Sequence, residues 1–204
     1  LAGLDRPLLI WQVWPRLVER RLAGHPRVGA ARVTLGWPGR VLVEVTERRP
    51  VAYLSLSSGF AEVDAEGRVL ALGPSVRGTG EPVVTGVDLD GVRAGMRLRD
   101  PASLRAVAVA AALGSSGRAR VSEIHLAAGG EVVLYTLEGL PVFLGVEERW
   151  EEKVQALEGI LGSLSRPALV QYVDLRSLHR PVVRMKDPQQ ARVPSPSPPP
   201  PLEG

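Results

Sequence analysis

The segment from residue 25 to residue 70 constrains the fold most, because short extended stretches alternate in it with proline and glycine turns. Residues 32–35 and 41–47 have the composition of strands, and the second places a valine at every other position. Gly36-Trp37-Pro38-Gly39 separates them, and its composition favours a hairpin connection. The sequence therefore predicts two antiparallel strands, with Trp37 and Pro38 serving the geometry and packing of the turn.

A helix is predicted just before this hairpin, over residues 14–24. Proline is tolerated in the first helical turn, where Pro15 stands, and apolar side chains repeat at helical spacing on one side. Gly24 followed by Pro26 ends the helix.

After Pro50 the pattern is mostly that of β structure. Asp64 and Gly67 are expected to form a turn, and residues 72–86 are rich in glycine and proline and predict a loop. Strands are predicted at residues 51–54, 60–63, 68–71, 121–127, 131–137, 140–144, 169–176 and 181–185. Helices are predicted from Asp100-Pro101 to a turn at residues 114–117, and over residues 147–164.

The composition excludes several classes of protein. The chain has 204 residues, 45% of them hydrophobic, which is enough for one large or two small globular domains. It has no cysteine, so disulfides and thiolate metal sites are excluded. Its formal charge is only +3 and no basic stripe carries interleaved aromatic residues, so no nucleic-acid partner is expected. The apolar run at residues 8–11 is far shorter than the roughly 18 residues that a membrane helix needs.

No constellation of an enzyme is visible, so neither catalytic residues, metal ligands nor cofactors are expected. None of His25, His125 and His179 stands at metal-ligand spacing from another histidine or from an acidic residue. Residues 114–117 lack the Gly-Lys-Ser/Thr of a phosphate loop. Asp88 and Asp90 lie beside glycines and are read as turn formers.

The order of these pieces resembles the FtsQ/DivIB family of bacterial cell-division proteins, in which a POTRA module precedes a larger β domain. Three groups of residues carry the resemblance. They are the hairpin region continued through Glu47-Arg48-Arg49-Pro50 and the turn at 64–67, residues 138–145 followed by Lys153, Leu157 and residues 160–161, and residues 172–176 with residues 181–184. The resemblance covers residues 1–186.

The resemblance implies an α+β fold with three segments. They are a truncated POTRA module at residues 1–48, a mainly antiparallel β domain with two helices at residues 49–186, and a disordered Pro-rich tail at residues 187–204. Family members also carry a membrane helix and the first strand and helix of the POTRA module, which we do not find. The anchor is expected in a part that would precede Leu1.

Family resemblance further implies the extracytoplasmic part of a divisome scaffold, at the cell membrane of the division septum. Its partners would be proteins of the FtsB/DivIC and FtsL type, recruited when a partner segment adds a strand to a sheet edge. The strand at residues 181–185 is the candidate edge, being the last before the tail. The expected partner-binding residues are Tyr172, Arg176, Pro181, Val182, Val183, Arg184 and Met185.

Other interpretations of these residues remain open. Arg176 is as readily solvated or paired within the chain, Tyr172 and Val183 are more often core residues in strands, and the tail is able to cover the edge. The alternative function is a POTRA-containing export or outer-membrane assembly component that binds extended polypeptides. Such proteins usually repeat the module, and this chain shows no internal repeat.

Overall fold

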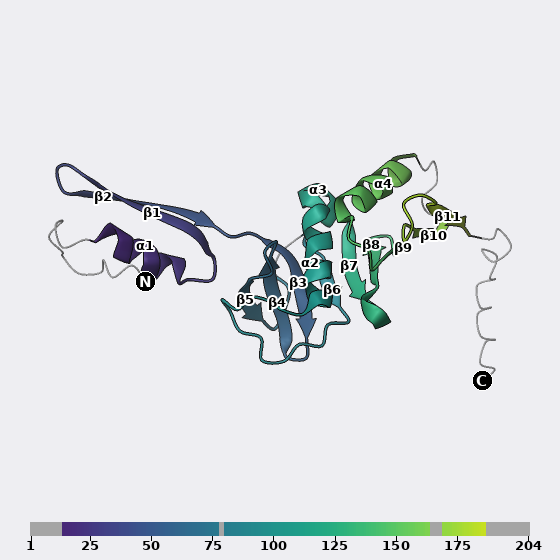
Figure 1. The fold of residues 1–204 in the computed structure, drawn as a ribbon, viewed down its shortest axis with the longest axis horizontal. Coiled ribbons are helices and arrows are strands. Elements are labelled where there is room, and N and C mark those ends of the chain that lie inside the picture. Colours follow the sequence, from purple (N-terminus) through teal and green to yellow (C-terminus); the bar gives the residue numbers. More distant parts are fainter. Residues whose placement is uncertain (1–13, 78–79, 164–168, 187–204) are drawn as a thin grey trace, which may run out of the picture.

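The computed structural model describes residues 14–77, 80–163 and 169–186, and these form two parts (Figure 1). The first is a POTRA-like part made of helix α1 (Pro15–Ala23) and the hairpin strands β1 (Val28–Gly36) and β2 (Arg40–Glu47). The second is a nine-stranded sheet with helices. The predicted α+β fold is therefore confirmed.

The POTRA-like part is small because one helix covers part of one face of a two-stranded ribbon. Val33 and Val43 are paired across the hairpin, and they pack with Val18 and Leu22 of α1. The Glu19 carboxylate accepts a hydrogen bond of 2.8 Å from the Val33 amide and so ties the helix to β1. The turn was correctly predicted, but Trp37 does not pack against the chain, since it is 95% exposed.

The large sheet has the order β11-β10-β9-β8-β7-β6-β3-β4-β5. The pairs β3–β6, β6–β7 and β9–β10 are parallel, and the other pairs are antiparallel. The strand bounds are β3 Pro50–Leu56, β4 Gly59–Asp64, β5 Val69–Gly73, β6 Val83–Thr85, β7 Val121–Leu126, β8 Val132–Thr136, β9 Pro141–Gly145, β10 Val170–Asp174 and β11 Val182–Met185.

Helices α2 (Pro101–Ala112) and α4 (Trp150–Ser163) pack on one face of this sheet and against each other. The Asp100 carboxylate caps α2 by accepting from the Ser103 amide at 2.7 Å, as its place before Pro101 leads one to expect. Along β9 the alternation is direct: Val142 and Leu144 are fully buried, whereas Phe143 between them is only half-buried. The face away from the helices is therefore the more open one.

Two predictions for this part were wrong. The loop expected over residues 72–86 contains the inner strand β6, whose three residues are too few to show alternation. The turn expected at residues 114–117 is a short helix, α3 (Gly114–Arg118), so three α-helices, not two, accompany the described sheet. Gly114 has a φ of 61°, which interrupts the helical path and separates α3 from α2.

No helix within residues 14–77, 80–163 and 169–186 has the length and apolar character that crossing a bilayer requires. The Pro-rich tail predicted at residues 187–204 lies outside the described residues.

Candidate functional site

Strand β11 forms one end of the nine-stranded sheet. It pairs only with β10 among the described residues, with Arg184 opposite Tyr172, Val183 opposite Val173 and Val182 opposite Asp174. Pro181 and all four residues of β11 are exposed. The predicted edge strand is thus found at the edge, whereas its role in binding stays a prediction.

The two faces of β11 differ in what they offer. Val183 stands opposite the buried Val173, so it lies on the face that the helices cover elsewhere, yet it is 36% exposed. Met185 lies on the same face, while Val182 and Arg184 lie on the more open one. Val183 is therefore not a core residue.

The opposite end of the sheet is paired with other residues of the chain at its start. Beside β5, the Val69 amide donates to the Met96 carbonyl at 2.9 Å, and the Gly95 amide donates to the Val69 carbonyl at 2.7 Å. The Leu98 amide likewise donates to the Gly67 carbonyl at 2.8 Å. The chain's own residues 95–98 thus pair with the start of this edge. No described segment pairs with the outer side of β11 in this way.

Tyr172 and Arg176 are both engaged within the molecule. The Tyr172 ring meets the Phe143 ring edge-on with 5.8 Å between centroids, and the Arg176 guanidinium lies 5.7 Å from the Phe143 centroid. Arg176 also pairs with Asp174 at 2.6 Å and with Glu131 at 3.6 Å. The Arg176 hydrogen bonds hold the pKa of the Asp174 carboxyl below its usual value. The internally paired interpretation of Arg176 is therefore the one that the structure supports, whereas Arg184 has no ion pair among the described residues.

A pocket of about 500 Å³ opens beside the start of β10. Strands β9 and β10 pair at only two positions, Val142–Val173 and Phe143–Asp174, so the two strands separate toward the start of β10. The pocket is lined by Arg120, Thr136, Glu138, Gly139, Leu140, Leu161, Val170, Gln171 and Lys186. Its lining comes from segments far apart in the sequence, which is why sequence reasoning missed it.

Lys153 of α4 connects this helix to the end of β9. Its side chain is fully buried, and its ammonium donates to the Leu144 carbonyl at 2.6 Å and to the Glu147 carbonyl at 3.2 Å. The Trp150 ring lies 5.3 Å away. Burial lowers the pKa of the Lys153 ammonium. This lysine fixes the end of β9 against the first turn of the helix.

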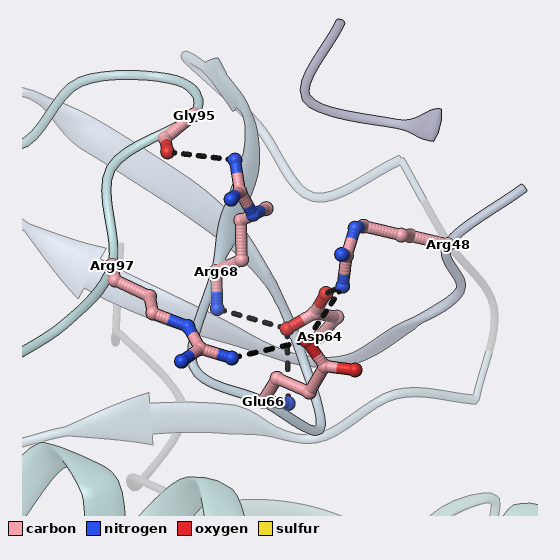
Figure 2. A network of polar contacts seen from close by, with 6 residues as sticks. All are labelled: Arg48, Asp64, Glu66, Arg68, Gly95 and Arg97. Carbon is pink, nitrogen blue, oxygen red and sulfur yellow. Dashed lines mark hydrogen bonds and ion pairs between the residues drawn. The ribbon is translucent and has the colours of Figure 1, made fainter. Parts of the chain in front are cut away.

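A polar network joins the POTRA-like part to the sheet (Figure 2). Arg48, just after β2, donates to Asp64 at 2.7 Å and to Glu66 at 2.9 Å, and Arg97 reaches Glu66 at 3.1 Å. The other Asp64 oxygen accepts from the amides of Glu66 and Arg68, which confirms the predicted turn. The hydrogen bond from Arg48 also lowers the pKa of the Glu66 carboxyl. Sequence reasoning identified the turn but not its contact with Arg48.

A second contact reinforces this junction. Arg27, in the connection before β1, forms an ion pair with Glu62 of β4, and the Arg48 amide donates to the Arg27 carbonyl at 2.8 Å. The orientation of the POTRA-like part thus depends on two arginines and three acidic residues.

The histidines and acidic residues do not converge on a reaction centre. In the described ranges no three histidine or acidic side chains are grouped as metal ligands. His125 lies 2.7 Å from the Thr85 hydroxyl and 3.7 Å from Glu123, on the surface of the central strands. Asp88 and Asp90 are exposed loop residues.

Comparison with known proteins identifies both parts. The family model described as "Cell division protein FtsQ/DivIB, C-terminal" matches residues 52–176, and the one described as "POTRA domain, FtsQ-type" matches residues 1–48. The cell division protein FtsQ of Myxococcus fulvus is 34% identical over 188 residues, covering 87% of this chain and 63% of that protein. The FtsQ of Rhodothermus marinus is 34% identical over 197 residues, covering 90% of this chain and 70% of that protein.

The chain therefore spans between 63% and 70% of the length of these relatives. A solved structure, the major extracytoplasmic domain of the trans isomer of DivIB from Geobacillus stearothermophilus, is similar with a TM-score of 0.43 and 21% identity. That likeness covers 60% of this chain and 98% of the solved one. Because a family model matches more than half of its residues, and a relative of which it covers 70% is 34% identical, the chain belongs to the FtsQ/DivIB family of non-enzymatic cell division proteins.

Proposed function

We propose that this chain is the extracytoplasmic part of a divisome scaffold protein, which recruits partner division proteins at the septum by adding a partner strand to β11. The observation that carries the proposal is the asymmetry of the sheet. Residues 95–98 of the chain itself pair with the start of the β5 edge, whereas no described residue pairs with the outer side of β11. An edge strand presents unpaired backbone N–H and C=O groups, which a partner segment satisfies by extending the sheet.

The side chains of β11 define the partner that fits. An added strand would meet Val182 and Arg184 on one face, and Val183 and Met185 on the other. Three exposed apolar side chains favour a partner strand with apolar residues on both faces, and Arg184 favours an acidic residue near it. Family membership supports a segment of the FtsB/DivIC type, bound to FtsL, as that partner.

Of the seven residues predicted from the sequence, Pro181 and the four residues of β11 retain the role proposed for them. Tyr172 lies in β10 and Arg176 just after it, one strand inward from the edge strand β11. Their contacts with the Phe143 ring of β9 hold β10 against that strand, so we assign them to positioning the edge. The pocket beside β10 lies next to Lys186, directly after β11, and offers an apolar anchor point to the same partner.

The experiment compares one charge placed on each of the two end strands. Val183→Glu should abolish capture of the FtsB/DivIC–FtsL complex in a pull-down, because a carboxylate on the added-strand interface is desolvated without a partner. Leu72→Glu, at an exposed position of β5 at the opposite end of the sheet, is the matched control and should bind normally. Both variants should unfold at nearly the wild-type temperature.

Three outcomes would count against the proposal. If Val183→Glu lowers the unfolding midpoint by many degrees, Val183 is a core residue and the edge is misassigned. If both variants bind the division complex normally, β11 is not the docking strand. If unfolded export substrates co-purify in place of division proteins, the export alternative is favoured.

Deleting residues 188–204 should leave folding unchanged, and thermal unfolding of the truncated chain checks this.

A further inference from the structure

We propose that the pocket between α2 and the first turn of α4 is a second docking site, which binds a protein segment carrying an acidic side chain beside a large apolar one. This inference goes beyond the proposed function, because the pocket belongs to the helices that cover the sheet and not to the edge strand β11. It rests on an arginine that lies in the pocket without a partner.

The walls of the pocket come from two helices and the connection before α4. Figure 1 shows the start of α4 beside α2. The pocket has a volume of about 360 Å³ and is lined by Pro101, Leu104, Arg105, Ala108, Glu148 and Trp150. The four residues of α2 recur at helical spacing and so share one side of that helix. Leu104 is 36% exposed and faces a site closed by the buried Trp150, which gives an apolar side chain of a partner two apolar walls.

Both helices that line the pocket are described over their whole length. Ser163, the last described residue before residues 164–168, ends α4 about 20 Å of helix beyond Trp150. Gly80, directly after residues 78–79, lies beside Ala119, past the far end of α2. The pocket is therefore formed within complete elements, away from the residues that flank these two segments.

The charge that selects the partner belongs to Arg105. Its side chain forms no hydrogen bond and no ion pair among the described residues, and its Nε atom is buried without an acceptor. Glu148 of the lining is exposed and does not pair with it. Asp100 interacts with the Arg105 charge at longer range, but its carboxylate accepts from the Ser103 amide and hydroxyl, both at 2.7 Å. A buried N–H without an acceptor is costly, and a carboxylate is able to accept from two guanidinium donors at once.

The turn between β7 and β8 holds this guanidinium at the pocket. A Cβ atom on Gly130 would collide with Nη2 of Arg105, so the absence of a side chain at this position makes room for the arginine. Gly130 has a φ of 77°, and its neighbour Gly129 has a φ of 76° with open space where a Cβ would lie. Arg105 is thus placed by the fold, whereas its hydrogen-bonding groups are left for a ligand.

The test titrates the full chain with two blocked tetrapeptides. One is acetyl-Ala-Asp-Leu-Ala-amide, and the other has asparagine in place of aspartate, so neither carries terminal charges. In two-dimensional amide NMR spectra the aspartate peptide should shift the indole N–H of Trp150 and the backbone amides of Leu104 and Gly130. It should bind roughly tenfold more tightly than the asparagine peptide, which is typical of one charge-assisted hydrogen bond.

Variants of the two charged lining residues should act in opposite directions. Arg105→Gln should weaken binding of the aspartate peptide roughly tenfold. Glu148→Gln should strengthen it, because Glu148 is a negative charge close to the place that the peptide carboxylate would take. Arg93→Gln, at an exposed arginine of the loop after β6, is the control and should bind normally.

The two glycines of the β7–β8 turn provide a matched pair that leaves the pocket lining unchanged. Gly130→Ala should weaken binding, because the added methyl group displaces the Arg105 guanidinium. Gly129→Ala imposes the same backbone strain without reaching Arg105 and should bind normally. Circular dichroism should show both variants folded to the same extent.

Four outcomes would overturn the inference. They are no shift at the pocket with either peptide, equal affinities for the two peptides, weaker binding by Glu148→Gln, and equal losses in the two glycine variants. A shift of the same amides on deletion of residues 188–204 would also overturn it, by identifying the chain's own tail as the occupant. Val183→Glu should bind the aspartate peptide normally, so failure of the strand-addition proposal is distinguishable from failure of this one.

Discussion

Replacing the buried lysine behind the candidate site tests the packing that supports it. Lys153 is fully buried, and the ammonium donates to two backbone carbonyls, those of Leu144 and Glu147. Lys153→Met keeps the volume and removes the donor. The Leu144 carbonyl then loses a charged hydrogen bond, at a cost of about 1.5–3 kcal/mol. Removing a buried charge that has no carboxylate within hydrogen-bonding distance offsets part of this cost.

We therefore expect Lys153→Met to lower the free energy of unfolding by about 1–2 kcal/mol, measured by urea denaturation. For a chain of this size the midpoint of thermal unfolding should fall by roughly 2–8 °C. Lys153→Ala should cost more, because it also leaves a cavity. Lys186→Met is the control, since Lys186 is exposed and is the other lysine of the chain.

The pH dependence gives an independent test. Burial lowers the pKa of Lys153 from the model-compound value of 10.5, so the folded state releases this proton at a lower pH than the unfolded state. Between the two pKa values the unfolded state binds more protons, and stability rises with pH. The stability of wild type relative to Lys153→Met should therefore increase as the pH approaches 10.5. A variant as stable as wild type, with a difference independent of pH, would refute the role given to the buried ammonium.

Two further predictions concern the junction and the main helix. Arg48→Gln should destabilise the chain by about 1–3 kcal/mol in a urea titration, because it removes the charged donor from the buried Asp64 carboxylate. Arg97→Gln, at a mostly exposed arginine, should have a much smaller effect in the same titration. Equal effects would contradict the importance given to Asp64. Asp100→Ala should cost about 1 kcal/mol through loss of the helix cap. The hydrogen bond from Ser103 lowers the pKa of Asp100 below 3.8. The stabilisation by the cap is therefore present above pH 3.8 and is lost as the pH falls through the folded-state pKa. A stability difference between wild type and Asp100→Ala that stays constant down to acid pH would exclude the cap.

Local signals in the sequence predicted most of the elements. Asp100 before Pro101 marked the start of α2, and the alternation of valines marked β2. Strand β6 was missed because its three residues become a strand only through their neighbours β3 and β7 on either side. Partners that are distant in sequence, such as Arg48 and Asp64, leave no local signal either.

Exposure was the harder property to predict. A tryptophan in a turn is usually packed, yet Trp37 is 95% exposed, because no described residue near the end of this hairpin covers the ring. Val183 is of a residue type common in core strands, but it lies at the border of the sheet, where it is 36% exposed. In both places the sequence identifies the residue type, whereas the position within the sheet decides what it contacts.

The pairing of residues 95–98 with the start of β5 has a consequence for stoichiometry. A fibre that grows by sheet extension requires two unpaired, complementary sheet edges on every subunit, so that each subunit pairs with one neighbour on either side. A subunit whose second border is shortened in this way favours stopping after one addition, either as a complex with one partner or as a symmetric pair of two copies. Self-association through β11 would then compete directly with partner binding, so a dimer of this chain should dissociate as partner is titrated in.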